Sequence, residues 1–255
     1  MFDSHCHLTD LDDPLGDLLS AQSAGVHSVL TCGYDPPSNA AVIALRARLP
    51  SLPIALGLHP WFAHLDIAPI LELIERQRPD VVGELGLDLW GDTPMLSLDR
   101  QMHVLDAQLQ LARRLDLPVT VHSRKAIEAV LSALRNHPGV RGALHAYSGS
   151  WEQLRPFLDA GFYLGIGGAI TRDCAKRLHR VARAAPLDRI VVETDSPAIG
   201  MDIVEPPHVR PAHLPRVVEA LARLRGMDPS ELAAVTDDNA ARLFGEKVRA
   251  TPRVQ

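Results

Sequence analysis

The sequence predicts an α/β fold, a single-domain (β/α)₈ TIM barrel with capping helices at the C-terminal end of the chain. Short β-branched runs alternate with longer amphipathic segments along nearly the whole chain. No Gly-x-Gly-x-x-Gly turn follows the first run, which speaks against an open doubly wound sheet, and Gly165–Gly168 is glycine-rich without that spacing. At 255 residues and 46% apolar, the chain has the length and core-forming capacity of one barrel.

The predicted strands are short runs rich in Val, Ile and Leu, each followed by a helical segment. They are Met1–His7, Val26–Cys32, Pro53–Leu58, Val81–Glu84, Pro118–His122, Gly142–His145, Phe162–Gly167 and Arg189–Thr194.

The predicted helices have apolar residues spaced three or four apart, as the inner face of a barrel helix requires. Leu105, Leu109, Ala112 and Leu115 form one such stripe. The helices are Leu15–Ala24, Pro37–Leu49, Ile67–Arg78, Leu98–Leu115, Ala126–His137, Trp151–Ala160, Arg172–Ala184 and Ala212–Leu224. Pro229–Phe244 is predicted to cap the barrel, and Lys247–Gln255 to fray, so that residues 1–248 form the domain and 249–255 its tail.

Composition and charge exclude several classes of protein. The net charge of −5 is unlike that of a protein whose whole surface binds nucleic acid. No apolar run reaches the roughly 18 residues of a membrane span, and the first residues lack a signal-peptide pattern, so a cytoplasmic location is expected. The three cysteines form no Cys-x-x-Cys pair, and no obligate protein partner is indicated.

The candidate catalytic residues lie where predicted strands end, which is where barrel enzymes collect their functional groups. His5 and His7 share one face of the first strand, while Cys6 points the other way. A lone His-x-His pair is as often a hydrogen-bonded core pair as a metal site. The full candidate set is His5, His7, Glu84, His122, His145 and Asp195.

Metal binding explains why two acids stand in apolar strands. A buried carboxylate costs several kcal/mol unless it is paired or holds a cation. Imidazole and carboxylate ligands without thiolate suit zinc, manganese or magnesium, and the set suffices for two ions. Paired ions about 4 Å apart clamp a phosphoryl group and activate water. We expect Glu84 and Asp195 to be catalytic, with Asp195 as the general base.

Six motifs in order identify a resemblance to the TatD family, metal-dependent deoxyribonucleases of the amidohydrolase-like superfamily. They are His5-x-His7, Gly57-Leu58-His59-Pro60, Gly83-Glu84-Leu85-Gly86-Leu87-Asp88, His122-Ser123-Arg124, His145-Ala146-Tyr147-Ser148-Gly149 and Glu193-Thr194-Asp195-Ser196-Pro197. The resemblance implies one metal at His5, His7, Glu84 and Asp195, and a second at Glu84, His122 and His145. Because no lysine precedes Lys125, the carbamylated lysine of many superfamily members is absent, and Glu84 takes the bridging position.

Two positions depart from the family pattern. Tyr147 replaces the usual Phe, and Val209 stands where the family has Asn, which puts in doubt how the loop after the eighth strand is held.

Substrate contacts are expected from His59, Arg124 and Tyr147, with Trp90 as a second ring for stacking. His59 and Arg124 could contact a phosphate, and the aromatic rings a base. Each of these residues also has a structural alternative: His59 could cap a loop, Arg124 could form a surface ion pair, and the two rings could pack within their loops.

Three functions are compatible with this site. The first is exonuclease cleavage of DNA, at a single strand or strand end. The second is hydrolysis of an amide or ester, as in an aminoacyl-tRNA deacylase or small-metabolite amidohydrolase, because metal-activated water attacks both kinds of centre. The third is a non-catalytic metal-binding barrel, which the intact ligand set disfavours.

Overall fold

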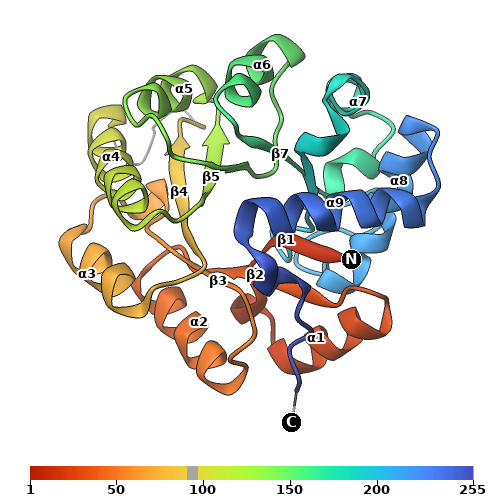
Figure 1. Cartoon of the computed structure of the whole chain (residues 1–255), viewed down its shortest axis with the longest axis horizontal. Coiled ribbons are helices and arrows are strands. Elements are labelled where there is room, and N and C mark those ends of the chain that lie inside the picture. Colours follow the sequence, from red (N-terminus) through yellow and green to blue (C-terminus); the bar gives the residue numbers. More distant parts are fainter. Residues whose placement is uncertain (91–96, 255) are drawn as a thin grey trace.

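The computed structural model describes residues 1–90 and 97–254, and within them eight parallel strands lie side by side in chain order. Figure 1 shows the strands at the centre of a ring of helices, which confirms the predicted TIM barrel. The strands are β1 (Phe2–Cys6), β2 (Ser28–Cys32), β3 (Ile54–Leu56), β4 (Val81–Asp88), β5 (Val119–Arg124), β6 (Gly142–Leu144), β7 (Tyr163–Ile166) and β8 (Ile190–Val192).

The helices begin at residues whose side chains bond the free amides of the first turn. Asp35 and Ser38 form a capping box at the start of α2, and Ser150 and Gln153 form another at the start of α6. The helices are α1 (Pro14–Ser23), α2 (Pro36–Arg48), α3 (Ala68–Gln77), α4 (Leu98–Leu115), α5 (Ile127–Arg135), α6 (Trp151–Asp159), α7 (Lys176–Ala184), α8 (Leu214–Arg225) and α9 (Pro229–Phe244).

The barrel closes between β1 and the segment that follows β8. The Asp195 amide donates to the His5 carbonyl at 2.9 Å, and the His7 amide donates to the Ser196 carbonyl at 2.8 Å. The buried Asp3 carboxylate completes the seam, because the Thr194 amide and hydroxyl both donate to it, at 3.0 and 2.6 Å. Two predicted metal ligands, His5 and Asp195, are therefore tied together by the closure itself.

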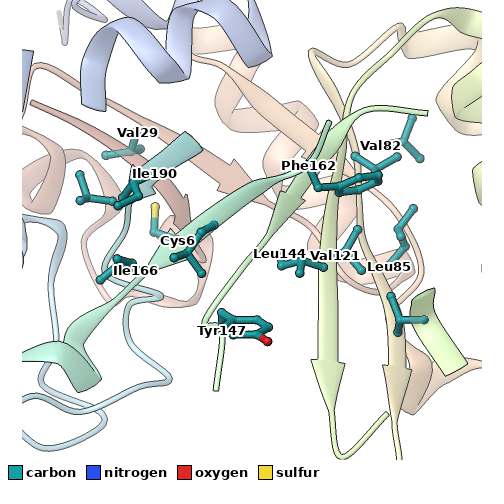
Figure 2. Close-up of a cluster of buried hydrophobic side chains, with 14 of the residues drawn as sticks. Cys6, Val29, Val82, Leu85, Val121, Leu144, Tyr147, Phe162, Ile166 and Ile190 are labelled. Atoms are coloured by element: carbon teal, nitrogen blue, oxygen red, sulfur yellow. The ribbon is translucent and has the colours of Figure 1, made fainter. Parts of the chain in front are cut away.

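The core has two parts. Between the strands and the helices lies a layer of side chains that includes Cys6, Val82 and Val121 (Figure 2). The second part fills the N-terminal mouth of the barrel, where Phe2 and the first residues of other strands pack against Phe244 and its neighbours in α9. Figure 1 shows α9 lying across the ring, which is the predicted capping helix.

The C-terminal segment is packed along the barrel instead of fraying from Lys247. Residues Glu246–Arg249 form a 3₁₀ turn (η6), and Val248 within it is buried. Pro252 is also buried, and its carbonyl accepts a hydrogen bond from Gln22 Nε2 at 2.8 Å. Gln255 lies outside the described residues.

Several predicted boundaries were wrong. Strand β4 continues beyond Glu84 to Asp88, and β5 continues to Arg124, because the two pair along their extended ends after a register irregularity between Val82 and Leu85. Helix α7 begins at Lys176, since residues Gly168–Thr171 form the separate 3₁₀ turn η3. None of the helices in the described part of the chain combines the length and apolar character that a bilayer span requires.

Candidate metal centre

The six predicted ligands meet around the carboxylate of Glu84. Its Oε2 lies 3.4 Å from Nε2 of both His5 and His7, and its Oε1 lies 2.9 Å from His145 Nε2 and 3.0 Å from His122 Nδ1. Asp195 Oδ1 lies 3.8 Å from His5 Nε2 and 3.5 Å from His7 Nε2. One carboxylate thus faces two pairs of histidines, and a second carboxylate faces one of those pairs.

Two glycines of β4 let this strand approach β5 closely. A Cβ at Gly83 would lie 2.6 Å from the Thr120 carbonyl oxygen, and one at Gly86 would lie 2.0 Å from that of His122. Both glycines also have positive φ angles, 143° and 146°, which side chains rarely permit. Only glycine fits at either position, and the close approach brings Glu84 beside His122.

Polar partners fix how the histidines of β1 present their rings. His5 Nδ1 lies 2.9 Å from Thr120 Oγ1, and His7 Nδ1 lies 3.0 Å from the Cys32 carbonyl. With Nδ1 engaged, Nε2 of each ring is left to face the carboxylates. Such partners set the orientation and the tautomer of metal-binding histidines.

His122 is held through Nε2 rather than Nδ1, by a residue that the sequence analysis did not select. Its Nε2 lies 3.2 Å from Asp88 Oδ2, so its Nδ1 faces Glu84. Asp88 also accepts hydrogen bonds from Trp61 Nε1 at 2.8 Å and from the Trp90 amide at 2.9 Å. The available signal was an acid in an apolar strand, the same signal that singled out Glu84.

The carboxyls and imidazoles of the centre shift one another's pKa. Burial opposes ionisation of Glu84 and Asp195, yet the surrounding imidazoles lower the pKa of both carboxyls. Burial likewise disfavours the cationic form of His7 and His145, but the two carboxylates raise their pKa to about 9 and about 10. Burial and the neighbouring His145 lower the pKa of His5 to about 4.

Three buried polar atoms at the centre have no hydrogen-bond partner. They are His5 Nε2, His145 Nδ1 and Asp195 Oδ1. Buried polar atoms are normally paired, so these three are accounted for if they face a cation. Three overlapping sets of side chains bring their ligand atoms within 4.8 Å of one another: His5 with His7 and Glu84, His5 with His145 and Asp195, and His59 with Glu84 and His122. The residues present therefore fit bound metal.

The predicted substrate contacts occupy different environments. His59 Nε2 lies 3.4 Å from Glu84 Oε1, and its Nδ1 accepts from the Trp61 amide at 3.2 Å, so it borders the centre and also caps a turn. Tyr147 is buried in the core (Figure 2), and its hydroxyl donates to the Ser150 carbonyl at 2.7 Å, which fits loop packing. Arg124 is exposed, with its guanidinium 4.5 Å from the centre of the Trp90 ring.

Two further buried acids stand behind the ligands. Besides closing the barrel, Asp3 accepts from the His5 amide at 3.3 Å, and burial raises its pKa to about 7. Glu193 accepts from the Ala146 amide at 2.5 Å and lies 3.9 Å from His145 Nδ1, and burial raises its pKa to about 8. Glu193 belongs to one of the motifs quoted above, and Asp3 lies two residues before another. The amides of Thr194 and Ala146, which donate to Asp3 and Glu193, come from distant parts of the chain.

The loop after β8 is held without the family's Asn. Val209 is fully buried, and Arg210 Nε lies 3.2 Å from Asp17 Oδ1 in α1. The Arg210 guanidinium also donates to the Pro207 carbonyl at 2.7 Å. Apolar burial and an ion pair thus pin the loop.

A (β/α)₈ barrel with imidazoles and carboxylates converging at the C-terminal ends of its strands defines a metal-dependent hydrolase. The sequence model of the family described as TatD related DNase matches residues 2–245, and the chain belongs to this family.

Relatives of similar length support the assignment. An uncharacterized metal-dependent hydrolase of Escherichia coli K12, YjjV, is 36% identical, over 95% of this chain and 96% of that protein. The Bacillus subtilis counterpart YabD is 32% identical, over 96% and 98%. The crystal structure of YjjV, described as a TatD homolog, superposes with a TM-score of 0.88 over 96% of this chain and 97% of that one, at 33% identity.

Proposed function

We propose that this protein is a deoxyribonuclease that cleaves phosphodiester bonds with two divalent metal ions. The observation that carries the proposal is the placement of Glu84. Its Oε2 faces His5 and His7, and its Oε1 faces His122 and His145. A single carboxylate with a histidine pair at each oxygen is suited to bridge two cations, and two-metal centres are typical of phosphodiester hydrolysis.

His5, His7 and Asp195 would hold one ion with Glu84, and His122 and His145 the other. When bound, such ions acidify water and neutralise the oxygens of a phosphoryl group. Imidazole ligands suit zinc, whereas carboxylate ligands suit manganese and magnesium. His59 borders the Glu84 Oε1 side, and burial lowers its pKa to about 3, so this neutral ring is suited to contact a substrate oxygen.

Asp195 is suited to the general-base role. Its Oδ1 is buried, faces His5 and His7 without a hydrogen bond, and the surrounding imidazoles lower the pKa of the carboxyl, so the group is ionised at neutral pH. Its φ of 51° lies in the left-handed region, which aspartate adopts more readily than most residues with a side chain, and its amide bonds the His5 carbonyl of β1. The carboxylate would accept the proton of the attacking water.

The decisive experiment incubates Mn²⁺-loaded protein with single-stranded and duplex DNA. We expect release of nucleotides, and a loss of at least about 100-fold in rate for Asp195→Asn, the usual contribution of a general base. Glu84→Gln should also lose activity and bind fewer than two Mn²⁺ per chain. Glu219→Gln, which removes an exposed acid of α8, is the matched control and should behave as the wild type.

Two results would contradict the proposal. DNA digestion undiminished by either variant would show that the centre does not cut the strand. Failure to cut DNA with any metal, together with turnover of ester or amide substrates, would replace the nuclease with the second function considered above, which the acidic net charge of −5 mildly favours.

A further inference from the structure

A groove of about 690 Å³ opens beside the metal centre on the same end of the barrel. Its walls include Trp90 after β4, Arg124 and Lys125 at the end of β5, Ser148 after β6, and Arg177 in α7. Arg124 stands two residues beyond the predicted ligand His122 along β5, about 7 Å at the rise of a strand. The wall of the groove at Arg124 is therefore close enough to the centre for the two to contact neighbouring parts of one substrate.

The groove gathers positive charge on an acidic protein. Within residues 1–90 and 97–254, no carboxylate lies within 4.0 Å of the charged groups of Arg124, Lys125 or Arg177. The acid in its wall is Glu128, which accepts from Gln153 Nε2 at 3.4 Å. The chain as a whole has 26 Lys and Arg against 31 Asp and Glu, so a groove with three cations and one acid among its lining residues departs from the overall balance of charge.

Lys125 is placed there at some cost in backbone energy. Its φ is 58°, in the left-handed region that residues with a side chain rarely adopt outside turns. The Lys125 Nζ lies 5.2 Å from the centre of the Trp90 ring, and the Arg124 guanidinium lies 4.5 Å from it.

Trp90 offers an exposed aromatic surface whose backbone is anchored. The residue is 54% exposed, yet its amide donates to Asp88 Oδ1 at 2.9 Å. The other oxygen of Asp88 lies 3.2 Å from His122 Nε2, so one carboxylate connects the backbone at Trp90 to a predicted metal ligand. An exposed indole beside a guanidinium is a surface on which unpaired bases stack.

We propose that this groove binds the part of a single-stranded polynucleotide that adjoins the bond being cut, with one phosphate at Lys125, a second phosphate at Arg177 and a base on Trp90. This inference rests on the proposed nuclease function and adds to it a strand-binding subsite. A single strand is required because a base within a duplex already has both faces covered by its neighbours.

The test measures binding of a fluorescein-labelled, hydrolysis-resistant phosphorothioate octamer of thymidine to Mn²⁺-loaded protein, by anisotropy at several salt concentrations. Each phosphate contact with a single strand contributes about −0.7 to the slope of log K against log salt. The double variant Lys125→Gln/Arg177→Gln should therefore reduce the magnitude of the slope by about 1.4. Trp90→Ala should raise Kd roughly fivefold or more.

The matched control is Lys176→Gln/Arg180→Gln, which removes two charges from exposed positions of α7 that do not line the groove. It should leave the slope nearly unchanged. An equal change of slope in both double variants would overturn the inference, because binding would then depend on overall charge alone. No change in either variant would overturn it as well, because Lys125 and Arg177 would then contact no phosphate.

Turnover of bis(p-nitrophenyl) phosphate separates this inference from the proposed function, because this small diester has no flanking nucleotides. Groove variants that cut it like the wild type but bind the octamer weakly support the subsite. Wild-type protein that cuts neither this diester nor DNA, yet binds the octamer through the groove, would refute the nuclease alone. Wild-type protein that cuts both, with groove variants that bind normally, would refute the subsite alone.

Discussion

Replacing Thr120 by Val should weaken metal binding without touching a ligand. The Thr120 hydroxyl lies 2.9 Å from His5 Nδ1, and both residues are buried. Burial lowers the pKa of His5 to about 4, so at neutral pH the ring carries one proton and one lone pair. With the hydroxyl accepting the Nδ1 proton, the lone pair of Nε2 points toward Glu84 and Asp195.

The size of the effect follows from what valine cannot do. Valine has the shape of threonine but accepts no hydrogen bond, and the alternative partner, Cys32 Sγ, is 3.6 Å away and a weak acceptor. Leaving a buried donor unpaired costs about 1–3 kcal/mol. Partners of this kind typically contribute 10- to 100-fold to metal affinity, so we expect a loss of roughly 1.4–2.7 kcal/mol in binding.

The assay is competition for Mn²⁺ or Zn²⁺ against a chromophoric chelator at fixed pH. Thr31→Val is the matched control, because Thr31 is also buried in a strand and its hydroxyl has no partner. Wild-type affinity in Thr120→Val, or an equal loss in Thr31→Val, would refute the claim that this hydroxyl orients His5.

Three further predictions follow from single contacts. Because the pKa values of His7 and His145 are about 9 and about 10, a metal ion that binds at pH 7 must displace a proton from each ring. Metal affinity measured by calorimetry should therefore rise between pH 7 and 9, by up to about 100-fold per pH unit. An affinity that does not change with pH would contradict this prediction. Asn239→Ala removes donors to the Leu187 and Ile190 carbonyls, at 2.8 and 2.7 Å, and should cost about 2–4 kcal/mol in urea unfolding. Tyr147→Phe should cost about 1 kcal/mol of stability and leave kcat/KM within about twofold, whereas a large fall in kcat/KM would restore the stacking role.

Local sequence pattern was enough to predict the barrel and to select candidate ligands that the fold brings together. Alternation along β1 places His5 and His7 on one face, and both lie 3.4 Å from the same oxygen of Glu84. Acids in apolar strands pointed to Glu84 and Asp195, since burying an unpaired charge is costly. The end of β4 was predicted too early, because its continuation to Asp88 depends on pairing with β5 rather than on residues within β4.

The chain by itself therefore determined the order of strands and helices and the choice of candidate metal-binding side chains, because periodicity and the cost of buried charge can be recognised from residues near one another. Only the tertiary structure decided which polar group holds each ligand. The partners of His5, His122 and Asp3 lie 115, 34 and 191 residues away along the chain. No local pattern encodes such contacts, since they exist only once the barrel has closed.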